Sequence, residues 1–208
     1  DALVTRTPGL ALGILTADPD LEKTAALRAL CDALPRPDHQ VIDLCDTAVS
    51  ELDLYRALAL ELGVRPSHRR AQLWIDLKKA LVHMVDERRT APVIVVDEAQ
   101  HLSDKILFDL SSFLNFAFDS RDLFTVWLVG LSPFAKRFQL GIHEALRSRA
   151  VFHEHLEPFD RTTFTAFVEH GLAAVGAQNK LVSDPALETL FRASRANPRV
   201  ASKMIRAA

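Results

Sequence analysis

Short apolar runs alternate with longer segments of helical periodicity from residue 9 to about residue 156. The runs are apolar at consecutive positions, which is typical of strands buried on both faces. They predict strands at Gly9–Thr16, Gln40–Leu44, Pro92–Asp97, Phe124–Val129 and Ala150–Leu156. The periodic segments predict helices from Glu22 to about Leu34, from Ser50 to Leu62, over residues 70–88 and from Ser103 to about Phe118. This alternation predicts an α/β fold, in which a parallel sheet is covered by helices on both faces.

Apolar spacing also predicts which side chains face the core. In the helix over residues 70–88, Leu73, Leu77, Leu81 and Met84 recur on one face. Trp74 and Trp127 lie in apolar periodic segments, so we expect them in the core rather than as stacking platforms for bases.

After Leu156 the pattern changes to helices without strands. Segments near 161–175, 184–194 and 198–207 keep helical spacing, and Pro158 marks the change. We predict an α/β core over residues 1–157 and a small helical lid over residues 158–208.

Composition excludes several classes of protein. Hydrophobic residues make up 49% of the 208 residues, charged residues make up 25%, and the formal net charge is −2. These values are typical of a folded globular chain, and they offer no general attraction to nucleic acid. No apolar run approaches the roughly 20 residues that a membrane span requires, and no signal peptide is visible. Cys31 and Cys45 form no CxxC pair, so we expect a cytoplasmic protein without a membrane partner.

The turn after the first predicted strand is a candidate phosphate-binding loop. A helix that begins with Lys23-Thr24 after a strand offers free N–H groups and a positive dipole end to a phosphate. Aligned with the motif G-x-x-x-x-G-K-[ST], however, the chain has Ala17 and Glu22 at the two glycine positions. Asp18, Asp20 and Glu22 bring three carboxylates towards this site, and each repels a phosphate by about 1 kcal/mol or more at 4 Å. The motif is therefore degenerate.

Two adjacent acids, Asp97 and Glu98, follow the apolar strand Val93–Val96. In nucleoside triphosphatases this is the Walker B arrangement, in which the aspartate holds Mg²⁺ and the glutamate polarises the attacking water. Acids at strand ends also cap the following helix, and this structural interpretation stays open for the pair.

These residues, in this order, give the chain a family resemblance. Lys23-Thr24 is followed by Asp-Glu-Ala-Gln-His-Leu (97–102), Leu-Asn-Phe-Ala-Phe-Asp-Ser (114–120), Leu-Val-Gly (128–130), Ala-Leu-Arg-Ser-Arg (145–149) and Ala-Asn-Pro-Arg (196–199). The chain resembles an AAA+ ATPase with a P-loop NTPase-like fold. More narrowly it resembles the ExeA-like ATPases encoded beside transposases, which include TniB-type transposition helpers.

The resemblance implies a role for each matching position. Lys23 and Thr24 bind the phosphates of ATP or ADP, Thr24 and Asp97 hold Mg²⁺, and Glu98 is the catalytic base. Arg149 is the arginine that acts on a neighbouring subunit, with Arg147 as the nearby alternative. Arg199 is the arginine that reaches the γ-phosphate from the lid. Leu131 stands where a polar sensor residue is expected, with Ser132 next to it. Arg149 and Arg199 as ordinary surface ion-pair residues remain the alternative.

The resemblance also implies partners. We expect a homo-oligomer whose nucleotide state is coupled to assembly and to binding of DNA, a transposase or another protein. Two alternatives stay open. One is a pseudo-ATPase adaptor that keeps the architecture without hydrolysis, which the acidic loop favours. The other is a secretion-linked ATPase domain of the ExeA type.

Other patterns are weaker candidates. Asp18-x-Asp20-x-Glu22 has the spacing of a calcium loop, but Lys23 stands where that loop needs glycine. His153-x-His155 has the spacing of a zinc pair without an identifiable third ligand, so surface histidines are the simpler interpretation. The clusters Arg69-Arg70 and Lys78-Lys79 fit a solvated helix face as well as a nucleic-acid surface.

Overall fold

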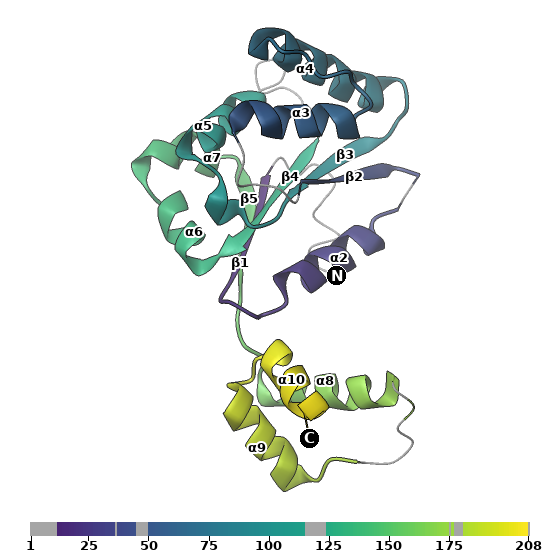
Figure 1. The fold of residues 1–208 in the computed structure, drawn as a ribbon, viewed down its shortest axis with the longest axis vertical. Helices are drawn as coiled ribbons and strands as arrows, with labels where there is room; N and C mark the ends of the chain where they lie inside the picture. Colours follow the sequence, from purple (N-terminus) through teal and green to yellow (C-terminus); the bar gives the residue numbers. More distant parts are fainter. Residues whose placement is uncertain are drawn as a thin grey trace. The chain divides into compact units, whose positions relative to one another are not determined.

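The computed structural model describes residues 12–35, 37–44, 50–114, 124–174, 176 and 181–207. These residues fall into two compact units (Figure 1). The first contains residues up to Thr16 together with Thr24–His155, and the second contains Ala17–Lys23 together with the residues from Leu156 onward. The turn after the first strand is thus grouped with the C-terminal helices.

The first unit is built on a five-stranded parallel sheet with the strand order β2-β3-β4-β1-β5. The strands are β1 (Leu12–Ala17), β2 (His39–Leu44), β3 (Ala91–Val96), β4 (Thr125–Leu131) and β5 (Ala150–Leu156). The register pairs Ile42 of β2 with Ile94 of β3, and Val95 of β3 with Trp127 of β4. The three strands predicted to be central are β1, β3 and β4, and this prediction is confirmed.

Helices connect the strands on both sides of the sheet. They are α2 (Lys23–Ala33), α3 (Glu51–Glu61), α4 (Arg70–Asp86), α5 (Asp104–Phe113), α6 (Ser132–Phe138) and α7 (Glu144–Arg147), with 3-10 turns η1 (Ala99–His101) and η3 (Gly141–His143). Figure 1 shows α2 on the opposite side of the sheet from α3 and α4. The predicted α/β fold, a P-loop NTPase-like parallel sheet flanked by helices, is therefore confirmed.

The structure refines several predicted boundaries. The helix predicted from Ser103 is capped by that serine, whose Oγ accepts the Ile106 N–H, and it ends at Phe113; its predicted continuation beyond Leu114 lies outside the described residues. β4 continues through Gly130 to Leu131, past its predicted end, and a Cβ at Gly130 would lie 3.0 Å from Gln100 Oε1 and 3.2 Å from the Phe134 ring. The sequence patterns did not predict the short helices α6 and α7.

Side chains of alternating strand positions separate the two faces of the sheet. Ile42, Ile94 and Val126 point to the face covered by α3, α4 and α5, where they join one large apolar cluster. The predicted inward face of α4, from Leu73 to Met84, is fully buried. Trp127 is 0% exposed, so it is a core residue as predicted. Trp74 is partly buried and packs edge-on against Tyr55 and Phe113 at the margin of the core.

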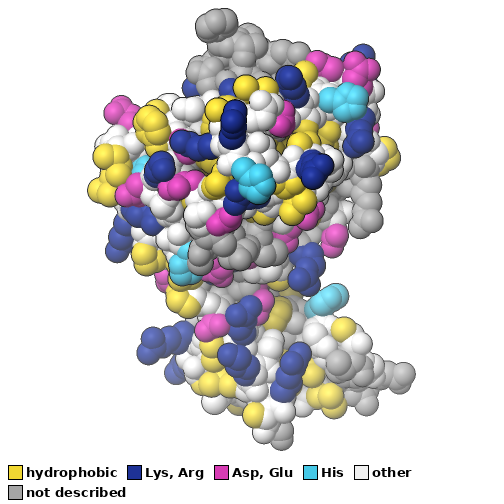
Figure 2. Space-filling view, turned by 45° about the horizontal axis from the view of Figure 1, so that its top comes forward, with side chains coloured by type: hydrophobic (Ala, Val, Ile, Leu, Met, Phe, Trp, Pro, Cys, Tyr) yellow, Lys and Arg dark blue, Asp and Glu magenta, His cyan; other side chains and the backbone are white. Residues whose placement is uncertain are grey.

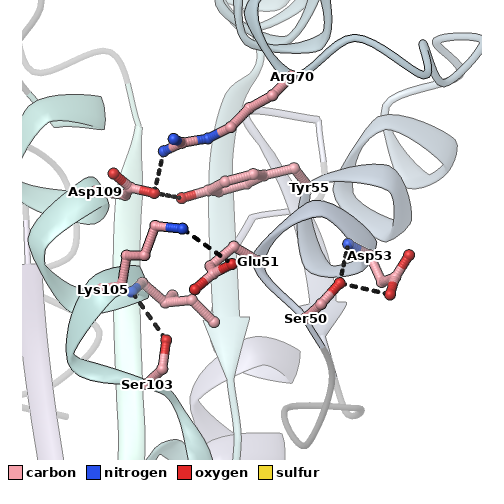
Figure 3. A network of polar contacts seen from close by, with 9 residues as sticks. Ser50, Glu51, Asp53, Tyr55, Arg70, Ser103, Lys105 and Asp109 are labelled. Atoms are coloured by element: carbon pink, nitrogen blue, oxygen red, sulfur yellow. Dashed lines mark hydrogen bonds and ion pairs between the residues drawn. The ribbon is translucent and has the colours of Figure 1, made fainter.

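A polar network ties α3, α4 and α5 together above this cluster (Figure 3). The buried Tyr55 hydroxyl of α3 donates a hydrogen bond to Asp109 of α5 at 3.0 Å, and Arg70 of α4 forms an ion pair with the same carboxylate oxygen. Lys105 and Glu51 add an exposed ion pair at 3.5 Å. Asp109 thus satisfies a buried hydroxyl that would otherwise cost the fold about 1–3 kcal/mol.

The second unit has a small core of its own. Its helices are α8 (Arg161–Ala174), α9 (Asp184–Ser194) and α10 (Pro198–Ala207), as the helical spacing predicts. The three helices pack together through a buried apolar cluster that includes Phe164, Val168, Leu187 and Ala201. Over the described part of both units, no helix is long and apolar enough to cross a membrane.

Gly13 of β1 should be intolerant of a side chain. A Cβ at this position lies 2.6 Å from the ring of the fully buried Trp127. Gly13→Ala is therefore expected to lower the free energy of unfolding by about 1–3 kcal/mol, as overpacked core positions do. Urea denaturation measures this, with Gly141→Ala as the control because nothing lies within 4 Å of a Cβ there. Equal stability of the two variants would contradict this packing.

Tyr55 should resist ionisation in the folded protein. Burial raises the pKa of its phenol, and the nearby Asp109 carboxylate raises it further. The unfolded chain ionises near pH 10, so this contribution to stability is complete below pH 10 and is lost as the pH rises above it. The chain has one tyrosine, so tyrosinate absorbance reports this group directly. We expect absorbance to appear only with unfolding, and at a lower pH in Asp109→Asn; native titration near pH 10 would refute the burial.

Candidate functional site

The carboxyl end of β3 and the first turn of α2 meet through one hydrogen bond. The Thr24 hydroxyl donates to Asp97 Oδ2 at 2.9 Å, across 73 positions of the chain. The other carboxylate oxygen, Oδ1, accepts the Glu98 N–H at 2.8 Å. A hydroxyl and a carboxylate in direct contact are two oxygen ligands of the kind that Mg²⁺ takes in proteins. The structure thus brings together the two residues that were predicted to hold the metal.

Glu98 has an unusual backbone. Its φ of 53° and ψ of 38° lie in the left-handed region, which costs a non-glycine residue about 1–2 kcal/mol. Such strain is a frequent feature of functional positions. The turn directs Glu98 and Asp97 to the same cavity of about 410 Å³, which Thr24 also lines.

Lys23 is the first residue of α2 and is only 8% exposed. Among the residues that the structure describes, no carboxylate forms an ion pair with its ammonium group. A helix N-terminus offers free N–H groups and a positive dipole end, so a lysine at this position suits an anionic ligand such as a phosphate.

The turn between Ala17 and Glu22 contains no glycine, but two of its residues have the left-handed backbone conformation that glycine favours. Asp20 and Glu22 have φ values of 66° and 54°, both in the left-handed region. Glu22 stands at the second glycine position of the phosphate-loop motif, where glycine adopts a left-handed conformation more easily than other residues do. The residue nevertheless adopts it at an energetic cost, so the backbone shape does not require glycine here.

Arg199 neutralises this acidic turn within the second unit. Its Nε donates to Glu22 Oε1 at 2.8 Å, and a second nitrogen contacts Asp20 Oδ1 at 3.3 Å. Asn197 Nδ2 also donates to the carbonyl of Pro19 at 3.3 Å. The arginine that the resemblance assigns to the γ-phosphate is thus bound to two carboxylates of its own chain.

Arg149 does not join Thr24, Asp97 and Glu98. It precedes β5, and the start of a parallel strand lies at the opposite edge of the sheet from the end of β3. Its neighbour Arg147 donates to the carbonyl of Gln139 at 2.7 Å. This placement is compatible with a role towards a second subunit and excludes one at the Asp97 of the same chain.

Sequence reasoning missed Gln100, which lies in η1 directly after β3. Its Oε1 accepts the N–H of Leu131 at 3.1 Å, and its Nε2 donates to the carboxylate of Glu98. Leu131, which stands at the expected sensor position, therefore contacts Gln100 through its backbone N–H. The signal was present in the Asp-Glu-Ala-Gln block, but a bond to β4 cannot be seen in local spacing.

Cys31 lines the 410 Å³ cavity together with Asp43 and Arg28. Burial raises the pKa of its thiol, and the carboxylates of Asp43 and Asp32 raise it further. The thiol is therefore less reactive than a free one. Cys45 lies outside the described residues.

The weaker metal candidates find no support in the described residues. His155 of the His153-x-His155 pair forms a hydrogen bond to the Thr16 hydroxyl at 3.0 Å. Within the described ranges, no group of three or more His, Cys, Asp and Glu side chains is placed to hold a metal ion, at the calcium-like spacing or elsewhere.

The residues present fit a nucleotide with Mg²⁺ in two respects. Lys23 places a cation at the N-terminus of α2, and Thr24 lies against Asp97 as a pair of metal ligands. The carboxylates of Asp20 and Glu22 oppose phosphate, but Arg199 offsets their charge.

Comparisons with known proteins agree with this geometry. General secretion pathway protein A of Aeromonas hydrophila is 28% identical to this chain over 191 residues, which cover 90% of the chain and 34% of that protein. The chain thus spans about a third of this relative's length.

Solved structures show the same fold. The ORC2 protein of Aeropyrum pernix, in its ADPNP-ADP complexes, superposes with a TM-score of 0.70 at 13% identity, covering 96% of this chain and 58% of that one. Cdc6p of Pyrobaculum aerophilum gives a TM-score of 0.64 at 16% identity, covering 91% and 52%. The profile of the AAA domain family matches residues 9–138. The chain therefore belongs to the AAA domain family and has the P-loop NTPase fold of AAA+ proteins.

Proposed function

We propose that the chain binds ATP with Mg²⁺ and hydrolyses it, and that nucleotide state controls its assembly. The hydrogen bond between Thr24 and Asp97 is the observation that carries this proposal, because it joins a helix N-terminus to the carboxyl end of a central strand. Ligands of open α/β sheets bind at this edge.

Each residue has a distinct task. Lys23 binds the phosphates, while the Thr24 hydroxyl and the Asp97 carboxylate hold the metal. Mg²⁺ neutralises charge on the transferring phosphoryl group when it is bound. Glu98 orients a water molecule and accepts its proton at a carboxylate oxygen. Arg149 reaches the phosphates of a neighbouring subunit.

Arg199 would reach the γ-phosphate of its own chain once it leaves Glu22 and Asp20. This exchange replaces carboxylate partners with phosphate ones. Its ion pairs are about half exposed, so each contributes little to stability and can be exchanged at small cost.

We propose a homo-oligomer that acts in transposition, as TniB-type helpers do, with DNA or a transposase as partner and the cytoplasm as its location. The core over residues 1–157 and the lid over residues 158–208 are the parts of this module. Lys203 and Arg206 are exposed on the same helix, α10, and two exposed cations at this spacing suit a phosphate backbone. On the face shown in Figure 2, Lys and Arg side chains predominate over acidic ones in the second unit.

A pseudo-ATPase adaptor is the second candidate, and the ion pairs of Arg199 favour it. The carboxylates of Glu22 and Asp20 pair with the guanidinium group of this arginine as a phosphate would, so the chain itself supplies an anion for it. The secretion-linked function of the ExeA type is supported by the similarity to general secretion pathway protein A. It differs from the transposition proposal in the partner and not in the nucleotide site.

Restoring the glycines should strengthen ATP binding. Ala17→Gly, Asp20→Gly and Glu22→Gly together remove two charges and the strain at two left-handed positions. At about 1 kcal/mol per charge, the Kd for ATP with Mg²⁺ should fall roughly 10-fold or more. Calorimetry measures the Kd, and ATP at 100 times the Kd should stabilise the fold by roughly 2.7 kcal/mol.

Matched variants identify the cause of that gain. Asp20→Asn with Glu22→Gln removes the same charges and keeps the side chains, whereas Glu61→Gln with Glu87→Gln removes two exposed charges elsewhere. The first pair should reproduce most of the gain and the second none. If neither the unmodified chain nor the glycine variant binds millimolar ATP, the ATPase proposal fails and the adaptor remains.

Glu98 and Arg149 should affect hydrolysis in different ways. Glu98→Gln should reduce hydrolysis at least ~100-fold and leave the Kd for ATP unchanged, because the residue orients water and does not hold phosphate. Arg149→Ala should slow hydrolysis only at concentrations where subunits assemble, which sedimentation and phosphate release measure together. Slow hydrolysis by Arg149→Ala monomers, relative to unmodified monomers, would contradict a role between subunits.

A further inference from the structure

Gln100 links the ends of two central strands through its side-chain amide. Its Oε1 accepts the backbone N–H of Leu131 at the end of β4, at 3.1 Å. A backbone N–H can only donate, so it determines which end of the amide is the oxygen. The Nε2 group therefore faces Glu98, and it donates a hydrogen bond to Oε2 of that carboxylate.

The segment that carries Gln100 is itself held in place. Arg137 of α6 donates from one guanidinium nitrogen to the carbonyl of Gln100 at 3.0 Å, and from another to the carbonyl of Leu102 at 2.8 Å. Asp104 accepts a contact from the buried His143 at 3.1 Å on the same side. The amide is thus fixed both by its own side-chain bonds and by the backbone that carries it.

The carboxylate of Glu98 needs such a restraint. Its backbone is in the left-handed region, outside the regular path of β3, and the residue borders the 410 Å³ cavity that Thr24 and Asp97 also line. The Gln100 amide, which is bound to the end of β4, fixes the direction from which this carboxylate receives a hydrogen bond.

We infer that Gln100 is a positioning residue for Glu98. Its amide holds the Glu98 carboxylate where this carboxylate meets the attacking water, and it links the carboxylate to the end of β4. The inference rests on the proposed ATP hydrolysis and adds a residue to it. Gln100 itself touches neither the phosphates nor the water. A purely structural role, capping the Leu131 N–H, is the competing interpretation.

Gln100→Glu separates the two roles. The glutamate keeps an oxygen that accepts the Leu131 N–H, but it replaces the donor to Glu98 with a second carboxylate. We expect kcat to fall ~10-fold to ~100-fold while KM changes less than about threefold. Gln139→Glu adds the same charge at an exposed site of the same unit and should leave both constants unchanged.

Gly130→Ala tests the same contact without a change of charge. A Cβ at residue 130 lies 3.0 Å from Gln100 Oε1 and 3.2 Å from the Phe134 ring, so both the amide and this ring must move by a few tenths of an ångström. We expect the same loss in kcat with little change in KM. Gly141→Ala, where a Cβ meets nothing within 4 Å, is the control.

A stability cycle tests the contact without using hydrolysis. Gln100→Glu should lower the Tm because two carboxylates then face each other, and adding Glu98→Gln should recover most of the loss because an amide again faces a carboxylate. The double variant should remain inactive, because its carboxylate is then at residue 100 and residue 98 carries an amide.

The outcomes distinguish the inference from the function on which it rests. Unchanged kcat in Gln100→Glu, with Glu98→Gln inactive, overturns the positioning role alone. Independent, additive effects on Tm in the cycle also overturn it. An unmodified chain that neither binds nor hydrolyses ATP overturns the proposed function and the positioning role together.

Discussion

The hydrogen bond between Thr24 and Asp97 depends on the packing of the whole sheet. It requires β1 and β3 to end at the same edge, which in turn requires apolar strands that are buried on both faces. The close approach of Gly13 to the Trp127 ring shows how little tolerance that packing has. The same edge then brings Glu98 and Lys23 within the first turns that follow these strands, so one constraint positions most of the site.

Much of this arrangement could be predicted from the sequence because it depends on local pattern. The run Val93–Val96 is apolar at every position, and Asp97 and Glu98 follow it directly, so both a central strand and acids at its carboxyl end were predictable. Gln100 could not be assigned a role, because its partner Leu131 is 31 positions away and the bond depends on the pairing of β3 with β4. Helices α6 and α7 are too short for a periodic signal to separate them from loops.

Electrostatics explains why a loop with so many acids still fits a phosphate-binding position. Asp20 and Glu22 oppose a polyanion, but Arg199 contacts both, so the charge that an incoming phosphate meets depends on where this arginine is bound. Lys23 forms no ion pair with a described carboxylate, so its charge at the N-terminus of α2 is unaffected by that exchange. In the proposed function, the choice between the ATPase and the adaptor therefore depends on whether phosphate or these carboxylates bind the Arg199 guanidinium group.

Backbone strain supports a functional edge in the same place. Among the described residues other than glycine, those with positive φ divide by position. Arg89, Arg195 and Ala196 follow the ends of helices α4 and α9, where a left-handed residue commonly terminates a helix. Asp20, Glu22 and Glu98 instead lie where β1 and β3 pass into the next helical turn. Helix termination does not explain strain at those positions, and backbone strain that has no such structural cause is frequent at functional sites.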